Sequence, residues 1–215
     1  MSKLVPPHGG GDLRPLLAPA DTREDQLARA TTLTTVPMTS REVSDILMFA
    51  LGAYTPLDGF MTEASWRGAC LDMTLSDGTF WPIPVTLSAS EELCNQIKMG
   101  QEVALTDSEN GQIMAILTVS EIYSPDKTLE CRSVYQTTDQ AHPGVASVMA
   151  HGPMYLAGPV SVLNEGNFPN YFSDLYLRPS ESRALFQEKG WSRVAAFQTR
   201  NPMHRSHEHL VKIAI

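Results

Sequence analysis

Near the start of the chain, apolar residues recur at the three- and four-residue spacing of a helix: Val43, Ile46, Leu47 and Ala50. Thr39 and Glu42 have the spacing of a capping box, in which each side chain satisfies a backbone N–H group of the other residue. The pattern predicts a helix of roughly three turns that ends near Gly52.

The segment LGAYTPLDGFM (51–61) interrupts the helical pattern. It contains Pro56 and the pair Asp58–Gly59, which favour a turn between Tyr54 and Phe60. The simplest interpretation is a packed turn anchored by aromatic side chains.

The following part of the chain is rich in short segments with strand-forming residues: 80–87, 102–107, 112–123 and 128–137. Residues 107–111 have the composition of a hairpin loop and residues 124–127 that of a second turn. Pro82 and Pro84 would keep their strand at an edge or a bulge, because proline cannot donate to a sheet. We expect an antiparallel β domain with a few short helices up to about residue 165.

In the last fifty residues the sequence changes from short strand-forming segments to helical patterns on either side of one apolar run. Ser180 can cap a helix that Gly190 ends. Residues 194–197 are an apolar run of the kind that forms a strand buried on both faces, and a new helical pattern opens at Pro202. A helix followed by a buried strand and a second helix is the order of elements with which an α/β domain begins. The chain stops in mid-pattern, which predicts the front part of a longer protein.

The composition is that of a folded protein, with 42% hydrophobic and 19% charged residues. The net charge of −8 argues against nucleic-acid binding through a broad basic face. Cys70, Cys94 and Cys131 are too far apart for a zinc knuckle, and we expect reduced core thiols. Neither a signal peptide nor a membrane span is apparent, so we expect a cytoplasmic protein without a membrane partner.

The main candidate site is the stretch FQTRNPMHRSHEHL (197–210). Asn201 is a favoured N-cap residue and Pro202 suits a first helical position, so a helix is expected to begin there. Gln198, Thr199 and Arg200 would then lie on the turn that follows the strand, where open α/β sheets bind ligands. The helix N-terminus and this turn predict a site for phosphate or sulfate.

Two histidines and the local charge strengthen this prediction. His204 and His207 are three residues apart, so both can face the same anion. From Gln198 to Lys212, three cations (Arg200, Arg205 and Lys212) outnumber the one carboxylate, Glu208, by two.

Other interpretations of the histidines stay open. Histidines on an amphipathic helix commonly form hydrogen bonds in a half-buried position or remain solvated. His204 and His207 could also share a zinc ion, but the chain shows no obvious third ligand, so we expect no protein-bound zinc and no other metal site.

Residues 198–207, QTRNPMHRSH, resemble the signature Gln-Thr-Arg-Asn-Pro-x-His-Arg-x-His of the ATP sulfurylase (sulfate adenylyltransferase) family. The two histidines match that family's form of the nucleotidyltransferase His-x-x-His motif. LGAYTPLDGFM is similar to the family's Gly-x-Phe-Ser-Pro-Leu-x-Gly-Phe-Met, with Tyr54 and Thr55 replacing the commoner Phe and Ser. FWPIPVTL, His142–Gly144 and GPMYLAGPV also occur in the family's order, so the resemblance covers about residues 20 to 215.

The resemblance implies an α+β then α/β architecture. Residues 1–168 would form an N-terminal PUA-like β-barrel domain, and residues 169–215 the truncated beginning of a Rossmann-like nucleotidyltransferase domain. The family's second ATP-binding loop is missing from the sequence, so the chain alone is expected to be incomplete and inactive.

The resemblance also implies the reaction of ATP with sulfate, giving adenylyl sulfate (APS) and pyrophosphate, or its reverse. By position, Thr199, Arg200, Asn201, His204 and His207 would be catalytic, and Gln198, Arg200 and Asn201 would bind sulfate or ATP. Mg²⁺ is expected as the cofactor, together with ATP. The full-length protein is expected to form a homo-oligomer without nucleic acid. A PUA-type RNA-binding module and a non-catalytic relative are the alternatives.

Overall fold

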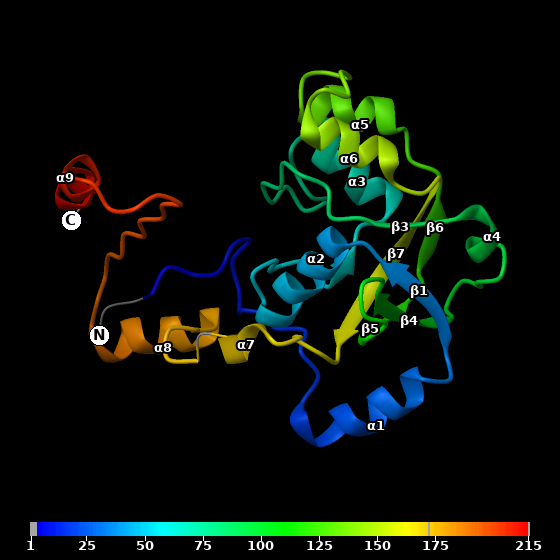
Figure 1. Ribbon diagram of the computed structural model, residues 1–215, viewed down its shortest axis with the longest axis horizontal. Helices are drawn as coiled ribbons and strands as arrows, with labels where there is room; N and C mark the ends of the chain where they lie inside the picture. Colours follow the sequence, from blue (N-terminus) through cyan, green and yellow to red (C-terminus); the bar gives the residue numbers. More distant parts are fainter. Residues whose placement is uncertain (1–3, 172, 215) are drawn as a thin grey trace. The chain divides into compact units, whose positions relative to one another are not determined.

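The computed structural model describes residues 4–171 and 173–214. They divide into two compact units (Figure 1). The sheet unit is Pro6–Pro179, and the C-terminal unit contains residues 4–5 and 180–214.

Within the described residues, seven strands form one sheet: β1 (Thr34–Met38), β2 (Gly59–Phe60), β3 (Leu87–Ala89), β4 (Glu102–Asp107), β5 (Ile113–Thr118), β6 (Glu121–Tyr123) and β7 (Met154–Val162). The main path runs β1-β4-β5-β7-β2, and β3 and β6 also pair with β7. β1 and β4 are parallel and all other pairs are antiparallel. Strand β7 therefore holds the sheet together, because its first half pairs with β3 and β6 and its second half with β2 and β5.

The helices of the sheet unit are short: α1 (Ala20–Ala30), α2 (Ser40–Leu51), α3 (Glu63–Leu71), α4 (Glu91–Cys94), α5 (Lys127–Val134), α6 (Pro143–Ala150) and α7 (Phe168–Tyr171). α2 packs on β1, β5 and β7, whereas α3, α5 and α6 gather at one end of the sheet (Figure 1). α8 (Pro179–Glu188) begins at the last residue of the sheet unit, and α9 (Arg205–Ala214) lies in the C-terminal unit.

The core lies between the sheet and these helices. Its largest fully buried apolar side chains come from helices and strands alike: Trp66, Tyr155, Phe49, Met38, Ile46 and Leu87. Cys70, Cys94 and Cys131 are free and buried, which confirms the prediction of reduced core thiols.

The predicted first helix is confirmed as α2. The Thr39 hydroxyl accepts the backbone N–H of Glu42, and the Glu42 carboxylate accepts the backbone N–H of Thr39 at 2.8 Å. Gly52 ends the helix with φ of 74°, a conformation that costs glycine little because it has no Cβ.

The turn predicted after α2 is also confirmed. Tyr54 packs edge-to-face against Phe49 and Trp81, and Phe60 packs edge-to-face against Phe49. The aromatic anchors thus hold the turn against the core. β2 follows immediately and pairs with β7.

Two predicted strands are wrong. Of residues 80–87 only Leu87 belongs to a strand, because Pro82 and Pro84 provide no N–H groups for a ladder. Residues 128–137 lie mostly in helix α5, whose N-terminus is capped by Asp126: its carboxylate accepts the Leu129 N–H at 2.9 Å.

Smaller corrections concern the ends of elements. The predicted strand 112–123 is divided into β5 and β6, because the backbone at Ser120 turns toward β7 and donates to the Ala157 carbonyl at 2.8 Å. α8 begins at Pro179, so Ser180 is inside the helix rather than its cap. Gly190 follows the helix with φ of 68°, as predicted.

Candidate functional site

Helix α9 begins at Arg205, three residues later than predicted from Asn201 and Pro202. The carbonyl of His204 accepts the N–H groups of His207 at 2.9 Å and Glu208 at 3.1 Å, so His204 occupies the N-cap position. The side chains explain this start. The Nδ1 of His204 accepts the Ser206 N–H at 3.4 Å, and the His204 N–H donates to His207 Nδ1 at 3.1 Å.

Asn201 belongs instead to the turn that precedes the helix. Its N–H donates to the Thr199 hydroxyl oxygen at 3.1 Å, and that hydroxyl donates to the Asn201 carbonyl at 3.2 Å. The turn is thus closed by Thr199, and the Asn201 side chain is exposed rather than used as a helix cap.

The structure brings the two predicted histidines together. The ring centroids of His204 and His207 are 6.4 Å apart with an interplanar angle of 84°, and His207 also packs on the Phe197 ring at 5.7 Å. Because each Nδ1 accepts a backbone N–H, the neutral tautomer of each ring carries its proton on Nε2. Both rings can therefore present an Nε2–H donor to an anion.

Gln198 and Arg200 are exposed and form no hydrogen bond or ion pair with the residues that the structure describes. The carboxylate of Glu208 is engaged elsewhere, because it pairs with Lys212 at 2.6 Å. The guanidinium of Arg200 therefore keeps its positive charge available for an anion.

The strand predicted at residues 194–197 is absent: the segment has no regular secondary structure and no strand partner among the described residues, and Val194 and Phe197 are 51% and 42% exposed. An apolar run becomes a buried strand only when neighbouring strands and covering helices are present. The described part of the C-terminal unit contains no strand that could pair with it.

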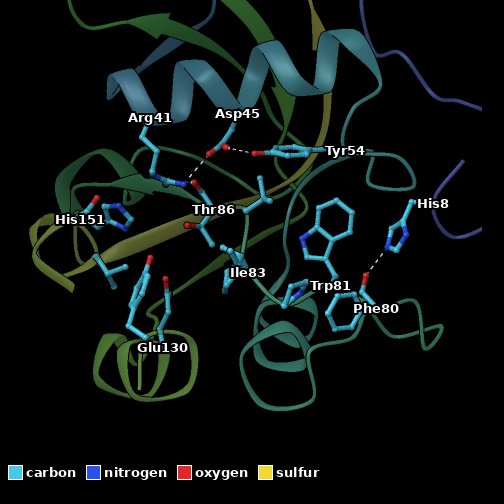
Figure 2. A pocket seen from close by; sticks show the side chains of 16 residues that line it. His8, Arg41, Asp45, Tyr54, Phe80, Trp81, Ile83, Thr86, Glu130 and His151 are labelled. Atoms are coloured by element: carbon cyan, nitrogen blue, oxygen red, sulfur yellow. Dashed lines mark hydrogen bonds and ion pairs between the residues drawn. The ribbon is translucent and has the colours of Figure 1, made fainter. Parts of the chain in front are cut away.

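Sequence reasoning missed a cavity of about 520 Å³ in the sheet unit (Figure 2). Its polar lining includes Arg41, Asp45, Tyr54, Glu130 and His151. These residues come from distant parts of the chain, so no local motif could have indicated them.

Burial shifts the ionisation of several lining groups. Desolvation raises the pKa of the Asp45 carboxyl despite the opposing charge of Arg41, and it raises the pKa of the Glu130 carboxyl despite a hydrogen bond from Trp66. Desolvation also lowers the pKa of His151 to about 4, helped by the positive charge of Arg41. His151 is therefore neutral at pH 7.

The described residues contain no group of three or more His, Cys, Asp or Glu side chains arranged to hold a metal ion. None of the helices in residues 4–171 and 173–214 has the length and apolar character needed to cross a membrane.

Comparison with protein families gives two matches. Residues 5–165 match the PUA-like domain family, and residues 173–215 match the ATP-sulfurylase family. The second match contains the whole candidate stretch 198–207.

Curated relatives match along the whole chain. Sulfate adenylyltransferase of Thiobacillus denitrificans is 54% identical over 215 residues, which are 100% of this chain and 53% of the relative. That of Syntrophobacter fumaroxidans is 54% identical over 100% of this chain and 53% of its own length, and that of Chlorobaculum tepidum is 52% identical over 99% and 53%. The chain thus spans about half the length of the curated relatives it matches.

Among solved structures, the hexameric APS kinase from Thiobacillus denitrificans is similar with a TM-score of 0.73 and 32% identity. The match covers 98% of this chain and 37% of that chain. Along its whole length the chain is similar to sulfate adenylyltransferases, and over residues 5–165 it belongs to the PUA-like domain family.

Proposed function

We propose that this chain provides the sulfate- and nucleotide-binding turn of an enzyme that transfers an adenylyl group between ATP and sulfate. The products are APS and pyrophosphate, or ATP and sulfate in the reverse direction. The proposal rests on the stretch 198–207, which lies within the match to the ATP-sulfurylase family and contains an exposed guanidinium and two imidazole rings that pack against each other.

The chemistry needs no covalent intermediate. A sulfate oxygen attacks the α-phosphorus of ATP in line, the new S–O–P linkage forms, and the bond to pyrophosphate breaks. The two reactants are both anions, so the protein has to hold them together and stabilise the charge that gathers on the α-phosphoryl oxygens.

Arg200 would bind sulfate, because the planar guanidinium can donate two parallel hydrogen bonds to a tetrahedral oxyanion. Gln198 would donate its amide N–H to a sulfate or phosphate oxygen. Thr199 and Asn201 hold the turn in shape through their mutual hydrogen bonds, and Asn201 adds a side-chain amide to the anion cradle.

His204 and His207 would contact the phosphates of the nucleotide. Their Nδ1 atoms are occupied by backbone N–H groups, so the Nε2–H groups are the donors. Two such donors at fixed positions stabilise the pentacoordinate phosphorus without reorganising during the reaction.

Mg²⁺ would enter with ATP, where it neutralises part of the charge on the phosphates. The residues of the turn fit this mode of binding. They offer imidazole, guanidinium, hydroxyl and amide groups rather than carboxylates, and Glu208 is paired with Lys212. We therefore expect the phosphates to hold the ion, with no zinc bound by this chain.

We further propose that residues 1–168 act as the PUA-like domain and that residues 169–215 begin a Rossmann-like catalytic domain. The family matches to residues 5–165 and 173–215 support this division. The likeness to a hexameric protein supports a homo-oligomer. The relatives' shared name favours the transferase over an RNA-binding module.

The proposal can be tested in a graft in which residues 1–215 replace the matching 53% of the Thiobacillus denitrificans relative. We expect the parent graft to form ATP from APS and pyrophosphate, followed with luciferase. Arg200→Ala should lower kcat about 10²- to 10³-fold, because it removes a donor to the oxyanion. Arg193→Ala, an exposed arginine outside the stretch, is the matched control and should keep the parental rate.

Thermal unfolding of both variants should match the parent, since both side chains are exposed. Near-normal turnover of Arg200→Ala would refute the role given to this residue.

A further inference from the structure

The cavity of the sheet unit has two chemically different sides. Figure 2 shows Glu130 and His151 on one side and Trp81 and His8 on the other, with Asp45 and Tyr54 above them. Its volume of about 520 Å³ is within the range of sites that hold small organic ligands.

The guanidinium of Arg41, the cationic side chain that lines the cavity, already forms hydrogen bonds within the protein. The Nη1 of Arg41 donates to Asp45 Oδ2 at 2.8 Å, and its Nη2 donates to the Thr86 carbonyl at 2.9 Å. The third nitrogen, Nε, is buried without a hydrogen-bond partner, so no ligand in the cavity can reach it without a rearrangement of the side chain. Little positive charge is therefore left for an anionic ligand.

Two carboxylates, Asp45 and Glu130, line the cavity together with the guanidinium of Arg41. Asp45 pairs with Arg41 and also accepts the Tyr54 hydroxyl at 2.8 Å, so its charge is compensated. Glu130 is only 4% exposed, and its one hydrogen-bond partner among the residues that the structure describes is the Trp66 Nε1–H, which donates to Oε2 at 2.7 Å. An indole N–H is a neutral donor, so a buried negative charge at Glu130 has no full counter-charge in hydrogen-bond contact.

His151 cannot supply that counter-charge. Its ring is neutral near pH 7, and its Nδ1 is hydrogen-bonded to the Tyr155 hydroxyl at 2.8 Å. Lys127 cannot supply it by direct contact either, because its ammonium group donates to the carbonyls of Met149 and His151.

The opposite side of the cavity is apolar and aromatic. The Trp81 ring stands edge-to-face against Tyr54, with centroids 5.8 Å apart. Phe80 and Ile83 border the cavity and are 57% and 56% exposed, so apolar surface remains uncovered at its mouth. A ligand with an apolar body would remove this surface from water.

We propose that this cavity binds a small organic cation that has an apolar body and an amino or amidino group. The cationic group lies beside Glu130 and donates a charge-assisted hydrogen bond to its carboxylate. The apolar body packs against Trp81 and Ile83, and an aromatic face there also attracts cations. This site shares no residue with the stretch 198–207, and we expect it to disfavour sulfate, phosphates and nucleotides, because Asp45 and Glu130 are acidic and Arg41 is paired with Asp45.

The test uses tryptamine as the cationic probe and indole-3-propionate as an anion with the same ring and a similar length. Each is titrated into the ¹⁵N-labelled chain while amide chemical shifts are followed. We expect tryptamine to shift the signals of cavity residues with a saturating curve. Indole-3-propionate should bind at least about tenfold more weakly, because Glu130 repels its carboxylate and Arg41 is already paired.

Glu130→Gln is the matched variant, because its amide oxygen can still accept the Trp66 N–H while the negative charge is lost. We expect it to weaken tryptamine binding about tenfold or more. Met99→Ala, an exposed residue outside the cavity, should bind as the parent does.

Equal binding of the two probes to the parent would overturn the proposal, as would an absence of saturable shifts at cavity residues. Unchanged tryptamine affinity in folded Glu130→Gln would overturn it as well. The comparison of the two probes uses the parent chain alone, so it decides the question even if the variant does not fold. Neither outcome depends on adenylyl transfer.

Discussion

Glu42 shows how one buried side chain can join distant parts of the chain. Its carboxylate accepts the N–H of Thr39 at 2.8 Å and the N–H of Ser88 at 2.7 Å, and it accepts both hydroxyl groups as well. The first contact is local, so the sequence predicts it as a capping box. The second contact joins residues 46 apart, and no sequence pattern indicates it.

Replacing Glu42 with alanine should therefore cost more than a helix cap. The N–H groups of Thr39 and Ser88 would lose the buried Glu42 carboxylate as their acceptor, and we expect a loss of about 2 to 4 kcal/mol in the free energy of unfolding. Urea denaturation measures this loss. Glu92→Ala removes an exposed glutamate from the first turn of α4 and should change stability by less than about 0.5 kcal/mol. Similar effects of the two changes would contradict this account of Glu42.

His151 should make stability depend on pH. Because burial lowers its folded pKa to about 4 from an ordinary value of 6.5, the unfolded chain binds a proton between these values that the folded chain does not. Its contribution to stability is therefore present above pH 6.5 and is lost as the pH falls toward about 4.

The matched measurement is the thermal midpoint of the parent and of His151→Gln at pH 7 and pH 4.5. We expect the parent to lose more of its midpoint temperature on acidification than the variant, because glutamine does not titrate. An equal loss in both proteins would show that His151 does not titrate as described.

Elements that depend on local chemistry were predictable. The Thr39 cap, the Gly52 stop and the hairpin between β4 and β5 all follow from residues close in sequence. Helix α5 was not predicted, because the strand-forming residues of 128–137 concealed the cap at Asp126. The hydrogen bond from Trp66 to Glu130 joins this helix to α3, and residues 64 apart in sequence give no local signal of such a contact.

Strand β7 depends on one close approach between backbones. Gly158 has φ of 143°, and a Cβ there would lie 2.1 Å from the Thr118 carbonyl oxygen. We expect Gly158→Ala to lower the free energy of unfolding by about 2 to 4 kcal/mol, because backbone atoms of neighbouring strands would have to separate. Chemical denaturation gives this value.

Gly111→Ala is the control for this prediction. Gly111 also has positive φ, 74°, but a Cβ there would have no heavy atom within 4 Å. It should cost only about 1 kcal/mol of backbone strain. If both variants lost the same stability, backbone conformation rather than the close approach would explain the effect.

For the whole molecule, the sequence indicated the similarity to sulfate adenylyltransferases better than it indicated the architecture. The stretch 198–207 is continuous, so its chemistry is visible without coordinates. The strand expected before it is absent, because a buried strand needs neighbours that the described residues do not provide. The cavity could not be predicted from the sequence, because its lining residues are far apart along the chain and come together only after folding. Examples are Arg41, Trp81, Glu130 and His151.

We propose that the turn at Arg200 and the start of helix α9 place a guanidinium and two imidazoles around the anions of adenylyl transfer. A crystal structure of the graft with APS bound tests it most directly. We predict the sulfate group of APS within hydrogen-bond distance of the Arg200 guanidinium, and its phosphate within reach of Nε2 of His204 and His207. APS bound away from residues 198–207, or those side chains turned away from it, would contradict the claim.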